Sequence, residues 1–504
     1  MRTAALNQQV ERILDTTRES QLQVIVQMEA DTRASVRLAR AAGQVLSRRR
    51  LSLSPRELLP GPFSKPTPRS VKQATASQLV LMSTGTAAMT AAAIRDKRLL
   101  SVNPLLDSDI VKAAMGRMGE PDAAAGAAGP SRTHFWTSRA MPLLLTRDEL
   151  QKLPEQVRGI KSIHANRRLG LPNVVETQQA ALEMADLLSC TWGIDRAKAP
   201  AVWGAYGARG QGTKIGLLDT GVDAQHPDLA GKVEAWAEFD AMGGLVPGSQ
   251  AHDTGEHGTH CAGTLVGGIA SGRRIGMAPE AKLAVGLVID ADKGGSDAQV
   301  LAGIDWAVEQ GVDVISMSLG GLVMTPETPP TYTEAILTCQ QAGIPVVIAI
   351  GNEGEQTTGS PGNDLFALSV GATDPRDRVA GFSGGRTQII TQSEYISDDY
   401  LPLAYSKPDL SAPGVAVFSS TPGGKWKAMS GTSMATPHVA GAIALLLSAT
   451  GIKAKVAGAD RAYLIQDLVC GSVDDMGESG QDHRYGFGRL DVLRAVDFAT
   501  ARGY

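Results

Sequence analysis

The chain has 504 residues and a net charge of −4, and its length predicts two or more domains. Hydrophobic residues make up 43% and charged residues 20% of the sequence, which is typical of globular proteins. This balance gives no reason to expect nucleic acid as a partner. The charge is uneven, because residues 1–190 carry 26 Lys and Arg against 17 Asp and Glu, whereas residues 191–504 carry 22 against 35. The two parts either attract each other or form two separately solvated surfaces.

The first 167 residues predict a small α+β module that is interrupted by an insertion. Residues 21–29 alternate apolar and polar side chains, which predicts a half-buried strand, and residues 30–46 carry the apolar stripe of a helix. Residues 48–132 are dominated by Ser, Pro and Ala, so we expect a partly disordered, low-complexity insertion there.

Order is expected to return after the insertion. Residues 134–145 predict a strand, a helix follows with Thr146 as its N-cap, and residues 159–167 predict another strand. Residues 168–189 are expected to be a linker to the second part of the chain.

From residue 190 to residue 504 the pattern changes to short apolar, β-branched runs that alternate with Gly-rich turns and Ala-rich helical segments. The runs are KIGLLDTG, KLAVGLVI, VDVISMSLG, IPVVIAIGN and FALSVGAT. Such runs are typical of strands buried on both faces of a parallel sheet. We therefore expect an α/β fold with a doubly wound, mainly parallel sheet, whose sites form at the carboxyl ends of the strands.

The N-terminal residues lack the continuous apolar core of a secretory signal and contain Glu11 and Asp15. The apolar stretch Leu79–Ile94 is short and interrupted by hydroxyl residues, so we expect a buried or loosely packed helix instead of a membrane span. The four cysteines form no C-x-x-C pair, which argues against a zinc ribbon or a disulfide framework and leaves two long-range disulfides open. We expect a cytoplasmic protein with no membrane partner.

Three polar residues stand where such a sheet places its site: Asp219 ends a strand, and His257 and Ser433 lie in Gly-rich segments that begin helices. Alone, each has a structural explanation, as a turn residue, a packed histidine and an N-cap. Together they fit nucleophilic catalysis, because a serine hydroxyl needs an imidazole to take its proton and the imidazole needs an acid to orient it.

A fourth candidate is Asn352, which follows another strand. Its side-chain amide is expected to donate to a developing oxyanion beside the backbone N–H of Ser433. A metal cluster built from His252, His257, His260 and Cys261 is the alternative, but the histidine pair lacks the H-E-x-x-H glutamate. We therefore expect no metal and no cofactor.

The segments around these residues resemble the motifs of subtilisin-like serine proteases (subtilases) in order and spacing. They are GLLDTGVDAQHPDL, HGTHCAGTL, SMSLGG, AIGNEG and SGTSMATPHVAG, and the resemblance runs from about Trp192 to the end of the chain. It implies that Asp219, His257 and Ser433 are the catalytic triad and that Asn352 is the oxyanion donor.

The same resemblance implies a substrate-binding edge at Ser318, Leu319 and Gly320, with Gly351 nearby, which pairs with the peptide as a β-strand. It also implies that Cys261 is the free thiol found in some branches of the family, where activity can be sensitive to thiol reagents.

One loop departs from the family pattern. In many members the loop after the catalytic histidine binds calcium; here it carries Arg273 and Arg274 opposite Asp228, which oppose a hard cation. We therefore expect no calcium at this loop.

The N-terminal strand–helix module resembles the inhibitory propeptide of the family. This resemblance implies that residues 1–167 are an inhibitory, fold-assisting pro-region and that the enzyme cuts itself within the linker 168–189. The predicted function is a serine endopeptidase, made as a zymogen, that acts on protein or peptide substrates and is inhibited by its own N-terminal region. Two alternatives remain open: a catalytically silenced fold that binds or regulates peptides, and a peptide ligase or cyclase in which an amine attacks the acyl-enzyme.

Overall fold

The computed structural model describes six stretches of the chain, namely residues 2–29, 103–118, 134–174, 189–326, 330–396 and 398–504. The helix expected over residues 30–46 and the apolar stretch Leu79–Ile94 lie outside these stretches.

A seven-stranded parallel sheet forms the centre of the larger domain, in the order β17-β14-β12-β10-β5-β7-β6. The expectation of an α/β fold with a parallel sheet is confirmed. The strands are β5 (Lys214–Asp219), β6 (Val233–Glu238), β7 (Lys282–Leu287), β10 (Val314–Met317), β12 (Val346–Ala349), β14 (Leu368–Thr373) and β17 (Leu410–Pro413).

The five inner strands of the sheet are covered on both faces, which explains why they lack polar alternation, whereas the edge strand β6 carries Glu234 and Glu238. Neighbouring residues of a strand point to opposite faces, and accordingly Leu217 and Leu218 belong to two different apolar cores. One core is completed by α12 (His257–Val266) and α15 (Thr432–Ala449), the other by α13 (Asp297–Glu309) and α14 (Thr333–Gln341).

Helix α15 is apolar all round. Among the described helices it is the one whose length and composition would allow it to cross a membrane, but 89% of that stretch is buried inside the molecule. It is therefore the central core helix of this domain, flanked on one side by α11 (Ala199–Tyr206), α12 and α18 (Val492–Ala501).

Smaller elements surround the main sheet. They are α10 (Trp192–Arg196), α16 (Ile452–Lys455), α17 (Gly458–Gly471), the two-residue strand β8 (Ile289–Asp290), and the pairs β11 (Gly321–Val323) with β13 (Thr358–Ser360), β15 (Arg386–Ile390) with β16 (Leu403–Lys407), and β18 (Val417–Thr421) with β19 (Lys425–Met429).

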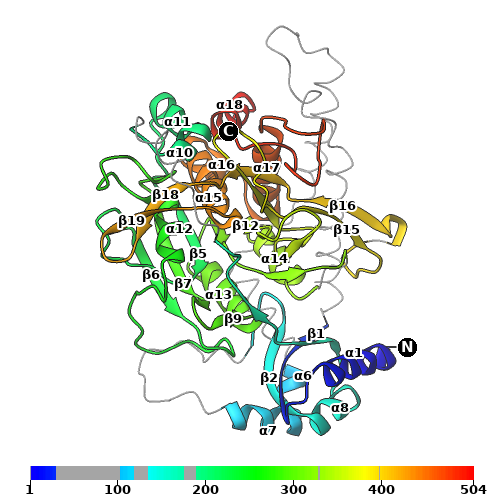
Figure 1. Cartoon of the computed structure of the whole chain (residues 1–504). Helices are drawn as coiled ribbons and strands as arrows, with labels where there is room; N and C mark the ends of the chain where they lie inside the picture. Colours follow the sequence, from blue (N-terminus) through cyan, green and yellow to red (C-terminus); the bar gives the residue numbers. More distant parts are fainter. Residues whose placement is uncertain (1, 30–102, 119–133, 175–188, 327–329, 397) are drawn as a thin grey trace.

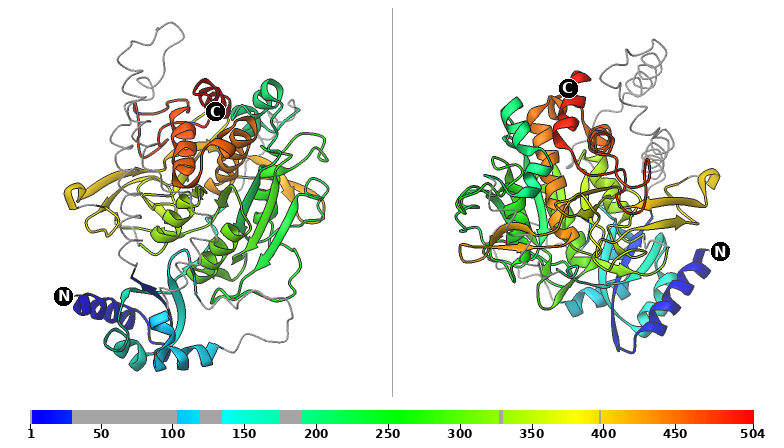
Figure 2. Two further views of the ribbon diagram at one scale, coloured as in Figure 1. Left: turned by 180° about the vertical axis from the view of Figure 1, so that it is seen from behind. Right: turned by 45° about the horizontal axis from the view of Figure 1, so that its top comes forward.

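The N-terminal module is a three-stranded antiparallel sheet in the order β2-β1-β3, with helices packed on it. Its elements are α1 (Arg2–Thr16), β1 (Gln21–Met28), α6 (Asn103–Leu106), α7 (Asp109–Met118), β2 (Ala140–Thr146), α8 (Arg147–Gln156) and β3 (Ile160–Ala165). Thr146 caps α8 as expected, in a capping box with Glu149. Figure 1 shows the module (blue to cyan) beside the end of the larger domain near α13, and Figure 2 shows α1 and α18 at opposite ends of the molecule.

Two expectations for the module need correction. The strand expected over residues 134–145 begins only at Ala140, because residues 134–139 form a turn in which Arg139 has a φ of 50°. Part of the expected insertion is helical: α6 and α7 bury Leu105, Val111 and Ala114 in the core of the module. An apolar face is enough to fix these helices despite the polar, Ala-rich surroundings.

Candidate active site

Asp219 and His257 meet at the carboxyl end of the sheet. Asp219 is the last residue of β5 and His257 the first residue of α12, both are buried, and Nδ1 of His257 lies 2.7 Å from Oδ1 of Asp219. The same carboxylate oxygen accepts the Thr220 backbone N–H at 2.8 Å. The helix can begin this close to the strand because residue 258 is glycine. A Cβ atom at this position would collide with the carbonyl oxygen of Gly221.

Ser433 is the second residue of α15 and is buried beside the same site. Its hydroxyl donates to the carbonyl oxygen of Ser318 at 3.3 Å, and the hydroxyl of Ser318 donates to the carbonyl oxygen of Ser433 at 2.9 Å. Nε2 of His257 has no hydrogen-bond partner among the residues that the structure describes. The imidazole is thus tied to Asp219 by one nitrogen, and the other nitrogen remains available for a proton.

Two opposing effects set the pKa of His257. Burial lowers the pKa of His257. The charge of Asp219 and the hydrogen bond to Asp219 raise this pKa by more than burial lowers it, so that it stands well above the ordinary value of 6.5. An imidazole with a raised pKa is a stronger base and binds a proton more tightly.

Asn352 follows β12, and its side chain has a defined orientation. Its Oδ1 accepts both the backbone N–H and the hydroxyl of Thr432, each at 2.8 Å, so Nδ2 faces the other way. Nδ2 donates to the carbonyl oxygen of Asn173 at 2.9 Å. A Cβ at residue 431 would lie 3.0 Å from Nδ2, so Gly431 leaves the room that this amide occupies.

The carbonyl that Asn352 holds belongs to the chain's own linker, whose first residues run through the site in extended form. β4 (Arg168–Leu169) pairs antiparallel with β9 (Gly294–Ser296), and the N–H of Gly320 donates to the carbonyl oxygen of Gly170 at 3.3 Å. The start of the expected linker is therefore a strand that lies between β9 and Gly320.

A cavity of about 270 Å³ opens beside this segment. Leu319, Gly320, Gly351, Glu353 and Gly359 are among the residues that line it, together with linker residues. Oε2 of Glu353 accepts the backbone N–H of Asn352 at 2.9 Å, which places this carboxylate at the cavity wall. The sequence does not single out Gly359, because one glycine among 56 carries no signal of its own.

The candidate metal ligands separate into two groups. Nδ1 of His257, the carboxylate of Asp219 and Sγ of Cys261 lie within 4.8 Å of one another, but the 2.7 Å between the first two atoms is a hydrogen-bond distance and too short for two ligands of a tetrahedral zinc ion. Nε2 of His260 lies 2.9 Å from the carbonyl oxygen of Val417, and burial lowers the pKa of His260 to about 3, so this histidine packs as a neutral core residue.

Cys261 of α12 is a buried free thiol. Sγ of Cys261 lies 3.9 Å from Nδ1 of His257 and 3.5 Å from the carbonyl oxygen of Ser433. Burial raises the pKa of this thiol, so it stands beside the site in its neutral form.

Asp228, which lies between β5 and β6 and faces the loop after α12, uses its carboxylate for hydrogen bonds within the protein. Oδ1 of Asp228 accepts the backbone N–H of Ala270 and Oδ2 accepts the indole N–H of Trp426, each at 2.7 Å. Arg273 stacks over the ring of Phe418, with the guanidinium carbon 5.1 Å from the ring centroid. Both carboxylate oxygens of Asp228 therefore already have donors.

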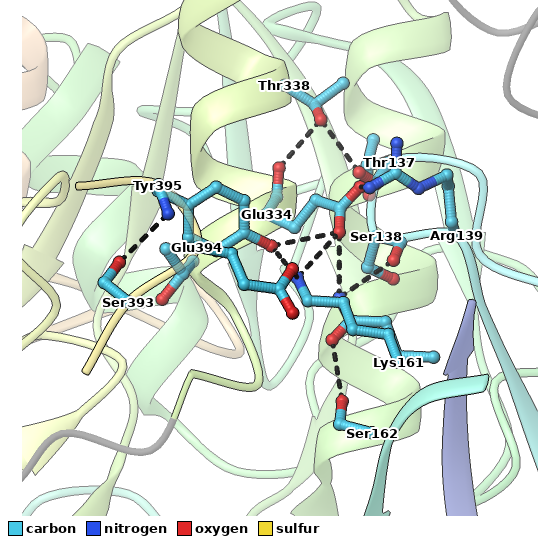
Figure 3. Close-up of polar contacts among 12 residues, drawn as sticks. Thr137, Ser138, Arg139, Lys161, Ser162, Glu334, Thr338, Ser393, Glu394 and Tyr395 are labelled. Atoms are coloured by element: carbon cyan, nitrogen blue, oxygen red, sulfur yellow. Dashed lines mark hydrogen bonds and ion pairs between the residues drawn. The ribbon is translucent and has the colours of Figure 1, made fainter. Parts of the chain in front are cut away.

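Buried charges hold the N-terminal module against α14. Figure 3 shows Arg139, Lys161 and Tyr395 converging on Glu334, whose carboxylate is fully buried. Arg139 forms an ion pair with Glu334, the Tyr395 hydroxyl donates to Oε2 of Glu334 at 3.1 Å, and Nζ of Lys161 lies 3.5 Å from the same oxygen. Gln27 of β1 donates to it as well, at 3.1 Å.

Acidic residues of α13 accept hydrogen bonds from the turn before β2. The backbone N–H groups of Trp136 and Thr137 donate to the carboxylate of Asp305 in α13, at 2.7 and 3.1 Å, and the indole N–H of Trp136 donates to Glu309 at 3.1 Å. The basic N-terminal part thus meets the acidic second part of the chain at specific carboxylates.

Comparison with known proteins identifies relatives of the larger domain. The model of the subtilase family matches residues 210–488. An intracellular serine protease of Paenibacillus polymyxa is 38% identical over 259 residues, which cover 50% of this chain and 72% of the relative. Subtilisin E of Bacillus subtilis (strain 168) is 36% identical over 280 residues, covering 54% of this chain and 65% of the relative. The major intracellular serine protease of the same organism is 35% identical over 273 residues, which cover 53% of this chain and 77% of the relative.

Proposed function

The chain belongs to the subtilase family of serine endopeptidases, and on that basis we propose that Asp219, His257 and Ser433 are its catalytic triad and that it is made as a self-processing zymogen. The observation that carries the proposal is the carbonyl of Asn173, which is held by Nδ2 of Asn352 at 2.9 Å next to Ser433. The linker lies where a peptide substrate would lie, paired with the edge at Gly320.

The proposed reaction begins when the Ser433 hydroxyl leaves its hydrogen bond to Ser318 and gives its proton to Nε2 of His257. Oγ attacks the substrate carbonyl carbon, and the oxyanion is stabilised by the Asn352 amide and the Ser433 backbone N–H. His257 then protonates the leaving amine, and water releases the acyl group by the same route. Asp219 holds the imidazole in the required tautomer and stabilises its charged form.

Self-cleavage between Asn173 and Val174 is the first expected result. The Asn173 carbonyl has the position expected of a scissile carbonyl, because Nδ2 of Asn352 donates to it. Purified wild-type protein should therefore contain a chain that starts at Val174. The Ser433→Ala protein should keep all 504 residues. Intact-mass spectrometry and N-terminal sequencing measure both. A new N-terminus that appears equally in the Ser433→Ala protein would assign the cut to another protease.

We further propose that the cleaved N-terminal fragment remains bound as an inhibitor through the buried contacts at Glu334 and Asp305. Breaking a buried ion pair costs about 3–5 kcal/mol, and Lys161, whose Nζ lies 3.5 Å from Oε2 of Glu334, offsets only part of that loss. Arg139→Ala should therefore raise the dissociation constant of the fragment by roughly 10²–10³-fold.

The matched control for Arg139→Ala is Lys152→Ala, which also removes one positive charge from the module. Lys152 pairs with Asp148 on the surface, with the two side chains 55% and 72% exposed. An exposed pair contributes about 0–1 kcal/mol, so this variant should inhibit nearly as well as the wild-type fragment. Equal inhibition by all three fragments would contradict the proposed docking.

The pH dependence of activity follows from the pKa of His257. Only the neutral imidazole accepts the proton of Ser433, so activity should be present above the pKa of His257 and be lost as the pH falls through it. Because that pKa is raised, the acidic limb of kcat/KM should have its midpoint above 6.5. A pH profile of peptide hydrolysis measures the midpoint, and a limb at or below pH 6.5 would contradict the Asp219–His257 assignment.

We also propose a cytoplasmic location with peptide or protein substrates. Two of the relatives are named intracellular serine proteases, and the free thiol of Cys261 fits a reducing compartment. Protein purified with its thiols blocked at lysis should accordingly contain no disulfide bond, and finding one would contradict the proposed compartment.

A further inference from the structure

Asp297 is a buried carboxylate next to the path of the linker, outside the four catalytic residues. It lies in the first turn of α13, directly after the N-cap Ser296, and its side chain is 0% exposed. The hydroxyl of Tyr332 donates to Oδ1 of Asp297 at 2.7 Å. Tyr332 is buried too, so this acceptor site is fixed by the larger domain alone.

An arginine of the N-terminal part occupies this site. Nε and Nη2 of Arg167 donate to the two oxygens of Asp297 at 2.8 and 3.1 Å, and Nη2 lies 3.4 Å from Oγ of Ser360. Burial lowers the pKa of Arg167, but Asp297 more than compensates, so that the pKa is raised. A guanidinium matches a carboxylate with two parallel hydrogen bonds, which a lysine cannot reproduce.

The backbone fixes the register of that arginine relative to the reaction centre. The N–H of Asp297 donates to the carbonyl oxygen of Arg167 at 3.1 Å, and β4 continues from Arg168 along β9 to Gly170 opposite Gly320. Arg167 therefore lies six residues before Asn173, on the same extended strand. Arg168 points to the other side of this strand and is exposed.

We propose that Asp297 and Tyr332 form a distal substrate subsite that selects an arginine six residues before the residue whose carbonyl Asn352 holds. The inference rests on the proposed endopeptidase function, because a substrate must replace the linker on the same edge. Once the linker has left, Asp297 is a carboxylate without its cation, and an arginine at this register restores the pair. The substrate class is thus a polypeptide with a basic residue well upstream of the cleaved bond.

The test uses internal competition between peptides, with the purified chain as it comes from expression. One peptide has the sequence of residues 165–178, a second carries Arg167→Gln and a third carries Arg168→Gln. Because the peptides compete in one tube, their relative rates give the ratio of kcat/KM even where the N-terminal fragment still occupies some of the enzyme. Charged hydrogen bonds of this kind predict that the native peptide is preferred over the Arg167→Gln peptide by on the order of tenfold or more. The Arg168→Gln peptide should be cleaved about as fast as the native one.

Variants of the enzyme test whether Asp297 causes the preference for the peptide that contains Arg167. In the Asp297→Asn chain the ratio between the native and Arg167→Gln peptides should fall towards one. Asp292→Asn removes the same charge from the exposed loop before β9 and should retain the preference. Equal cleavage of the two peptides by the wild-type chain, or a preference that survives in Asp297→Asn, would overturn the subsite while leaving the endopeptidase function intact. Cleavage of none of the peptides would overturn the proposed function and the subsite with it.

Discussion

Replacing Ser433 by alanine should lower kcat for peptide hydrolysis by roughly 10⁶-fold, the size of effect known for removal of the nucleophile in a subtilisin. The reason is that acylation needs the hydroxyl oxygen itself, and the neighbouring hydroxyl of Thr432 is engaged in a hydrogen bond to Oδ1 of Asn352 at 2.8 Å. Residual activity would come from substrate binding and the oxyanion donors alone. Hydrolysis of a fluorogenic peptide measures the loss.

The matched control is Ser448→Ala at the other end of α15. Ser448 accepts the backbone N–H of Gly210 at 3.0 Å and donates to the carbonyl oxygen of Leu445. Removing its hydroxyl should therefore lower the stability of the fold and leave the active site unchanged. This variant should keep near-wild-type kcat, with a cost of about 1 kcal/mol in unfolding free energy. If Ser433→Ala kept wild-type turnover, the assignment of the nucleophile would be wrong.

Asn352→Ala should lower kcat by about 10²–10³-fold and leave KM nearly unchanged. The amide donates to the carbonyl oxygen of Asn173 in the resting state, and its contribution should grow as negative charge develops on that oxygen. Steady-state kinetics separates kcat from KM. A rise in KM at constant kcat would mean that Asn352 binds the ground state and does not stabilise the transition state.

Much of the larger domain could be predicted from its sequence, because the signals there are local. The five inner strands are the short apolar runs that the sequence singles out, and the parallel sheet is confirmed; the sequence does not single out the edge strands β6 and β17, because neither is such a run. Asp219, His257 and Ser433 are far apart in the chain, but each stands at an end of an element. The topology of a doubly wound sheet brings such ends to one edge.

The contacts between the two parts of the chain could not be predicted, because they join residues without a local signal. Arg139 and Glu334 are 195 positions apart, and neither differs in the sequence from an ordinary surface charge. The same holds for Arg167 and Asp297, because the sequence shows Asp297 only as an acidic residue at a helix start. Helix α1 is different: Leu6, Val10 and Ile13 recur at helical spacing, so periodicity would have found it.

The most direct test of the account is labelling with a fluorophosphonate, a reagent that phosphonylates a serine only when an adjacent base activates it. Purified processed protein should gain one phosphonyl group, and the modified peptide should contain Ser433. The His257→Ala protein should gain none, because the base that takes the hydroxyl proton is missing. A label on another residue, or an unlabelled Ser433 in protein from which the N-terminal fragment has been removed, would contradict the claim that this chain is an active serine endopeptidase.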